Sequence, residues 1–251
     1  MTVAADPRLR ALAAAHPYPL VFATISGAHL YGFPSADSDY DLRGAHLLPL
    51  EAIVGLERGP DTIERMGVEA GLDLDLVTHD LGKFVRLMMK PNGYVLEQLH
   101  SPLVVATSPA HAELRRLAHG CVTRGHSRHY LGFAATQWQL FTAQTPPRRK
   151  PLLYVYRVLL TGIHLMRTGE VEANLVRLNE AAQLRHVAEL IAQKTGGHES
   201  ATIASADAAF HEREYLRLRA ALAGEASASK LPEVPSTRRE LHELLVGLRC
   251  R

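Results

Sequence analysis

The chain has 251 residues, enough for one large domain or two small ones. Apolar residues make up 47% and charged residues 22%, which together with only two cysteines exclude a disordered chain, a fibre and a disulfide-rich miniprotein. The formal net charge is +2, no apolar run reaches the ~18 residues of a membrane span, and the first residues show no signal-peptide pattern. We therefore expect a soluble cytoplasmic protein that contacts no membrane; its oligomeric state stays open.

The first 108 residues mix helical and strand patterns. A short helix is predicted over 7–15, and an amphipathic helix begins at Leu81 and ends before Pro91. In the strand pattern that follows Gly71, leucines alternate with Asp73, Asp75 and Val77, so the two aspartates share one face. Strands are expected over 18–25, 39–48, 61–68 and 72–78, the last two as a hairpin.

Beyond about residue 108 the strand patterns end, and helical periodicity fills the chain. The sequence thus predicts an α+β fold, with a mixed-sheet domain over residues 1–108 and an all-helical domain over 109–251. Helices are expected over 110–118, 130–141, 152–166, 185–194, 206–221 and 238–248.

Two pairs of aspartates indicate chemistry. Asp39 and Asp41 are two residues apart on a predicted strand, so both side chains project from one face, and Asp73 and Asp75 repeat the spacing. Carboxylates held this close repel each other unless a cation lies between them. Mg²⁺ or Mn²⁺ takes oxygen ligands and bridges to phosphate, so two such pairs on neighbouring strands would suit two-metal phosphoryl chemistry. An isolated Asp-x-Asp is more often an exposed pair on a strand.

The loop before Asp39 adds a second signal. Gly27 and Gly32 permit a close backbone approach, so the turn can present N–H groups to a phosphate. Gly27-Ala28, ten residues and then Asp39-x-Asp41 resembles the Gly-Ser and Asp-x-Asp signature of the DNA polymerase β-like nucleotidyltransferase superfamily. Residues 20–170 resemble one branch of it, the RNA repair pathway (RlaP or YcgL-type) family of predicted nucleotidyltransferases. The matching blocks are 27–32, 38–44, 81–84, 90–92, 96–99, Arg157 and 165–169.

The resemblance implies a metal-dependent enzyme that acts on a nucleoside triphosphate and on a nucleic-acid or protein acceptor. It implies that Asp39, Asp41 and Asp75 are catalytic and bind Mg²⁺ or Mn²⁺, with Asp73 in reserve. The implied nucleotide-binding residues are Ser26, Gly27, Ala28, Ser38, Arg43, Lys83 and Asn92.

One position departs from the family pattern. Ala28 stands where the signature has serine, so a hydroxyl expected near the phosphate is missing. A hydrogen bond to a charged group is worth ~1.5–3 kcal/mol. Three interpretations follow: Ser26 replaces the hydroxyl, backbone N–H groups suffice, or the chain is a catalytically silent binder of nucleotide or RNA.

The predicted helical half suggests an alternative function. Residues 1–110 carry 8 basic and 13 acidic side chains, whereas residues 111–251 carry 20 and 13, which favours contact with RNA or DNA. Arg157 and His164 are two helical turns apart, and this spacing resembles the Arg-x₄₋₆-His motif of HEPN domains. The alternative is therefore a nuclease, a fused form of a minimal nucleotidyltransferase–HEPN toxin–antitoxin pair, with Arg157 and His164 as its site.

Overall fold

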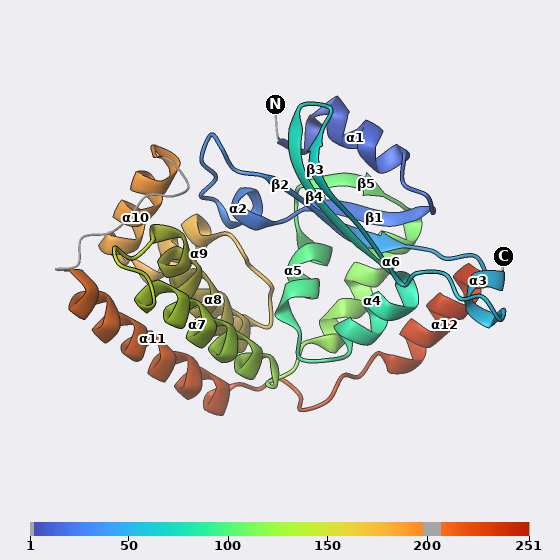
Figure 1. Cartoon of the computed structure of the whole chain (residues 1–251). Coiled ribbons are helices and arrows are strands. Elements are labelled where there is room, and N and C mark those ends of the chain that lie inside the picture. The colour runs from blue at the N-terminus through green and yellow to red at the C-terminus, as the bar shows by residue number, and fades with distance from the viewer. Residues whose placement is uncertain (1–2, 198–206, 251) are drawn as a thin grey trace. The chain divides into compact units, whose positions relative to one another are not determined.

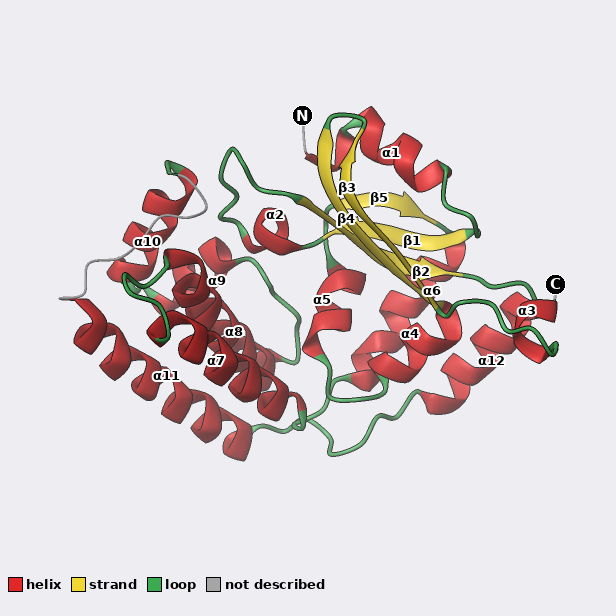
Figure 2. Cartoon of the chain, viewed as in Figure 1, coloured by secondary structure: helices red, strands yellow, loops and turns green. Residues whose placement is uncertain are grey.

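The computed structural model describes residues 3–197 and 207–250. These residues form two compact units, which we describe separately (Figure 1). The first unit contains the chain up to residue 30, residues 39–122 and the chain from residue 234, and the second contains residues 31–38 and 123–233. A sheet lies in the first unit and the second is helical, so the predicted α+β fold is confirmed (Figure 2). In the described part of the chain, no helix has the length and apolar character to cross a membrane.

The two units do not follow the predicted division at residue 108. Helix α6 (Pro109–Ala118) and helix α12 (Arg238–Arg249) both belong to the first unit, where they contact each other. Thr237, just before α12, donates a hydrogen bond from its hydroxyl to the Leu117 carbonyl at 2.9 Å. The difference arises because an amphipathic pattern shows that a helix has a buried face, but not which core buries it.

The sheet has five strands in the order β3-β4-β2-β1-β5. Strands β2 and β4 are parallel, and all the other neighbours are antiparallel. Strand β5 was not predicted, because four residues are too few for a clear alternation. The strands are β1 (Leu20–Ile25), β2 (Tyr40–His46), β3 (Thr62–Glu69), β4 (Leu72–Asp80) and β5 (Val104–Thr107).

Helices cover the two faces of the sheet differently. On one face, helix α1 (Pro7–Ala14) packs over a core that includes Leu42, Leu74 and Leu76. Helices α4 (Leu81–Met88), α5 (Gly93–His100) and α6 contact the strands from the other side (Figure 1). The short helices of this unit are α2 (Gly27–Tyr31) and α3 (Glu51–Val54), with 3₁₀ turns at Val3–Ala5 and His119–Cys121.

Helix α8 (Arg149–Thr168) is the centre of the second unit. More than half of its residues are buried, because four neighbouring helices pack around it. The four neighbours of α8 are α7 (His126–Thr142), α9 (Leu175–Ala182), α10 (Arg185–Thr195) and α11 (Ala208–Ala228). The helix predicted from residue 206 is α11, which begins at Ala208; Ala206 itself lies outside the described residues.

Candidate functional site

The parallel pairing of β2 with β4 places two of the predicted carboxylates side by side. Asp41 lies directly opposite Asp75 in the register of the two strands. Along β4, buried Leu74 and Leu76 alternate with the half-buried Asp75, which therefore points away from the leucine core. Paired residues of neighbouring strands face the same side, so Asp41 shares this face with Asp75.

Arg43 lies between these two carboxylates. Its Nη2 donates to Asp41 Oδ1 and to Asp75 Oδ2, both at 2.6 Å. Its Nη1 donates to the Asp75 carbonyl, and its Nε donates to the Tyr94 hydroxyl on α5 at 3.0 Å. Burial alone lowers the pKa of Arg43, but Tyr94, Asp75 and Asp41 outweigh it and raise the pKa above its usual value. The group between the carboxylates is therefore a permanent cation.

The glycine loop approaches the same site from the end of β1. The backbone N–H of Ser26 donates to the Asp41 carbonyl at 2.8 Å. Gly27 has a φ of +59°, and a Cβ there would collide with the Asp41 carboxylate. Only glycine satisfies both conditions. The turn-rich loop predicted here contains helix α2, and Ala28 is buried in it.

Ser26 is a candidate for the missing hydroxyl. Its side chain is fully buried, and its Oγ has no hydrogen-bond partner among the residues that the structure describes. A buried hydroxyl without a hydrogen bond usually lowers the stability of the fold by ~1–3 kcal/mol. The unpaired Ser26 Oγ therefore indicates a hydrogen bond that is made only with a ligand or a water. Tyr94 was missed by the sequence analysis, because an aromatic residue in the first turn of a helix has no distinctive pattern.

The other predicted residues of the first unit lie outside the register pair of Asp41 and Asp75. Asp39 precedes β2 and is half-buried. Asp73 is exposed and lies opposite Val68 of β3, before the residues of β4 that pair with β2. Lys83 Nζ donates to Asp61 at 2.9 Å, beyond the far end of β4 from Asp75. Asn92 is half-buried just before α5.

Ser38 lies in the second unit and stabilises a turn there. The Ser35 N–H donates to the Ser38 hydroxyl at 3.0 Å, and the Ser38 N–H donates to the Ser35 carbonyl at 3.1 Å. The buried Lys194 donates to the Ser35 hydroxyl at 2.5 Å. The middle of the loop between the glycines and the aspartates is thus held by the helical unit.

The two residues of the nuclease alternative have different environments on α8. Arg157 is fully buried, with its guanidinium 3.8 Å above the centre of the Tyr31 ring. This cation–π contact stabilises the end of α2 within the second unit. His164 is partly exposed and lines a pocket. Because its guanidinium is stacked on the Tyr31 ring, the position of Arg157 favours a structural role.

The donor set at Asp41 and Asp75 fits a hard divalent cation. The two carboxylates supply oxygens from neighbouring strands. Within residues 3–197 and 207–250, no group of three or more His, Cys, Asp or Glu side chains is positioned to hold a metal. Arg43 lies where the two carboxylates meet, so a divalent cation and this guanidinium would compete for the same oxygens.

We expect Arg43→Gln to destabilise the metal-free protein by ~2 kcal/mol, or about 4–8 °C, because two neighbouring carboxylates lose their cation. Mn²⁺ should then stabilise the variant more than it stabilises the wild type, since ligand binding to the folded state raises stability. Thermal melts in EDTA and in Mn²⁺ measure both effects, and Arg43→Lys is the charge-preserving control. Equal Mn²⁺ stabilisation of all three proteins would show that Arg43 does not compete with a metal.

The sequence of the chain is similar to a known protein family and to individual known proteins. A sequence model of the RNA repair pathway DNA polymerase beta family (RlaP) matches residues 1–247. The chain is 32% identical over 158 residues to the uncharacterized protein MJ0002 of Methanocaldococcus jannaschii, which covers 61% of this chain and 63% of that protein. It is 30% identical over 154 residues to the uncharacterized protein YcgL of Bacillus subtilis, with 61% and 58% covered. The matches thus span about three fifths of these relatives, and no solved structure matches the chain.

Proposed function

The chain belongs to the RNA repair pathway DNA polymerase beta family, and we propose that it is a metal-dependent nucleotidyltransferase with an RNA acceptor. The observation that carries the proposal is the pairing of Asp41 with Asp75 on neighbouring strands, directly against the glycine loop. This arrangement concentrates hard oxygen ligands beside backbone that has room only for glycine. Such a site suits the phosphates of a nucleoside triphosphate.

Each group near the carboxylates has a role in this proposal. Asp41 and Asp75, with Asp39 as the third carboxylate, would hold Mg²⁺ or Mn²⁺, which when bound neutralises phosphate charge and activates the attacking oxygen. Gly27 lets the loop lie close to the phosphates, and the buried Ser26 hydroxyl donates in place of the signature serine. Once Nη2 of Arg43 is released from the carboxylates, this nitrogen donates to a phosphate oxygen in a charge-assisted hydrogen bond.

The choice of RNA as acceptor rests on charge and on the family. Residues 111–251 carry the excess of basic side chains, and the family is described by its RNA repair pathway. Arg148, Arg149 and Lys150 form a basic cluster at the start of α8, where Arg148 is exposed and the other two are half-exposed. A cluster of basic side chains binds RNA by contacting the phosphates of the RNA backbone.

We expect RNA affinity to fall steeply with salt, with a log–log slope of about −0.7 for each phosphate that the protein neutralises. Replacing Arg148 and Lys150 with glutamine should weaken binding and make the slope shallower by ~0.7 for each phosphate that is no longer neutralised. Arg239→Gln, an exposed charge on α12, is the control. Fluorescence anisotropy with a labelled single-stranded RNA at several salt concentrations measures the slope. A flat salt dependence would exclude backbone binding.

Transfer itself is tested with labelled nucleoside triphosphates, an RNA panel and Mg²⁺ or Mn²⁺. We expect a labelled, lengthened RNA that disappears when EDTA is added. RNA cleavage that resists EDTA and is lost in His164→Ala would instead support the nuclease alternative. Nucleotide or RNA binding with neither reaction would indicate a silent binder.

A further inference from the structure

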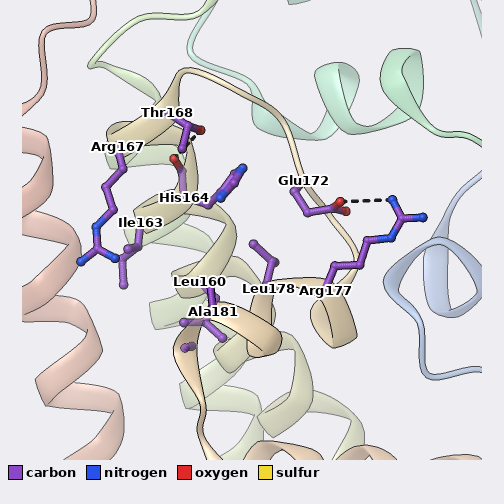
Figure 3. Close-up of a pocket in the computed structure, with 10 residues that line it drawn as sticks. Leu160, Ile163, His164, Arg167, Thr168, Glu172, Arg177, Leu178 and Ala181 are labelled. Carbon is purple, nitrogen blue, oxygen red and sulfur yellow. Dashed lines mark hydrogen bonds and ion pairs between the residues drawn. The ribbon is translucent and has the colours of Figure 1, made fainter.

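A pocket lies in the second unit between helices α8 and α9 (Figure 3). Its volume is about 390 Å³, within the range of small-molecule sites. None of its residues belongs to the carboxylate cluster. They are Leu160, Ile163, His164, Arg167 and Thr168 of α8, Glu172 of the connecting segment, and Arg177, Leu178, Ala181 and Ala182 of α9.

The pocket combines an apolar wall with a polar rim. Leu160, Ile163 and Leu178 are almost fully buried and supply the wall together with the two alanines. The rim carries two guanidinium groups, an imidazole and one carboxylate. Such a combination suits a ligand with a flat apolar body, an anionic group and hydrogen-bond donors.

The rim cations differ in how firmly they are held. Arg167 pairs with Glu225 of α11 at 2.6 Å. Arg177 pairs with Glu172 at 3.4 Å, and its side chain is 62% exposed (Figure 3). A long, exposed ion pair contributes little to stability, so Arg177 can exchange its partner for a phosphate at small cost.

The carboxylate of Glu172 is held in place by the backbone. Its Oε1 accepts a hydrogen bond from the Asn174 N–H at 2.7 Å, and its Oε2 faces Arg177. Ionised carboxylates only accept hydrogen bonds, and each oxygen has two acceptor sites. Glu172 therefore favours a ligand that presents two adjacent donors, as guanine does with its N1–H and its exocyclic amino group.

We propose that this pocket binds a guanine nucleotide, with the base against the leucine wall, its donors on Glu172 and its phosphate on Arg177. The nucleotide is either free guanosine monophosphate or the terminal guanosine of an RNA strand, since both present the same groups. The proposal needs no metal and does not depend on nucleotidyl transfer. It assigns a binding site to a unit in which the proposed function places only a basic surface.

Isothermal titration calorimetry of the full chain with GMP, AMP and UMP, in EDTA, tests the site. EDTA removes any metal-dependent binding at Asp41 and Asp75, so a failure here leaves the proposed function untouched. We expect GMP to bind more tightly than AMP or UMP. Arg177→Gln should weaken GMP binding about tenfold or more, because a hydrogen-bonded charge is removed.

Three further variants separate the contributions. Glu172→Gln should remove the preference for GMP over AMP. Ala181→Leu, at an exposed position that tolerates a larger side chain, should weaken all three nucleotides by filling the pocket. Arg185→Gln, which removes an exposed charge of α10 outside the pocket, should change nothing.

A short RNA ending in guanosine distinguishes the two sources of the nucleotide. If it binds more tightly than GMP and loses affinity in Ala181→Leu, the site receives an RNA end; if GMP binds as well or better, the site receives the free nucleotide. The proposal is wrong if neither ligand binds at millimolar concentration, or if Arg177→Gln and Ala181→Leu, with unchanged melting temperatures, bind GMP as the wild type does.

Discussion

Replacing Asp41 with asparagine is expected to reduce nucleotidyl transfer about a hundredfold or more. Even the outer partners of metal ligands are worth ~10–100-fold in affinity or activity, and Asp41 is proposed as a direct ligand. The change removes the negative charge and keeps the shape, so the contact with Gly27 and the strand register are preserved. Initial rates of transfer in Mg²⁺ and in Mn²⁺ measure the loss.

Asp73→Asn is the matched control for this experiment. It removes one carboxylate charge from β4, two residues before Asp75. Asp73 is exposed, however, and precedes the residues of β4 that pair with β2. We expect Asp75→Asn to behave like Asp41→Asn and Asp73→Asn to behave like the wild type. Loss of transfer in Asp73→Asn alone would place the catalytic carboxylate of β4 at Asp73 instead of Asp75.

Replacing Asp80 with alanine is expected to have the largest effect on stability, ~3–5 kcal/mol, because it leaves a buried guanidinium without its carboxylate. Asp80 is 6% exposed, and Arg249 of α12 donates to its Oδ1 at 2.8 Å and to its Oδ2 at 2.6 Å. Asp80 Oδ2 also accepts from the Gly82 N–H at 2.7 Å and so caps α4. Urea unfolding measures the loss.

Asp6→Ala is the surface counterpart of this change. Asp6 also caps a helix and also pairs with an arginine, since it accepts from the Arg8 N–H at 2.9 Å and from its guanidinium at 2.7 Å. That pair is exposed, so we expect a far smaller loss of stability. Equal losses in the two variants would mean that the bond from Arg249 to Asp80 adds nothing to the capping of α4.

The local features of the site follow directly from the sequence. Alternation alone places the leucines of β4 on one face and Asp75 on the other, and the structure confirms it. Arg43 is two residues from Asp41 on β2, so strand geometry places both side chains on one face, and the ion pair between them is present. Both are short-range consequences of strand geometry.

The long-range features of the site could not be predicted in the same way. The register that sets Asp41 opposite Asp75 joins strands that are parallel and more than thirty residues apart, and no local pattern encodes it. Tyr94 reaches Arg43 only through the packing of α5. The hydrogen bond from Lys194 to Ser35 links residues 159 positions apart. The sequence shows the loop between Gly27 and Asp39 only as a run of turn residues, and it does not show which residue holds that loop.

The most direct test of the carboxylate site is a titration of Mn²⁺ into the nucleotide-free protein. Binding is measured by calorimetry or from the spin-resonance signal of free Mn²⁺. We predict saturable binding to the wild type and to Asp73→Asn, and loss of that binding in the double variant Asp41→Asn with Asp75→Asn. A double variant that binds Mn²⁺ with the affinity of the wild type would contradict the assignment of the metal to Asp41 and Asp75.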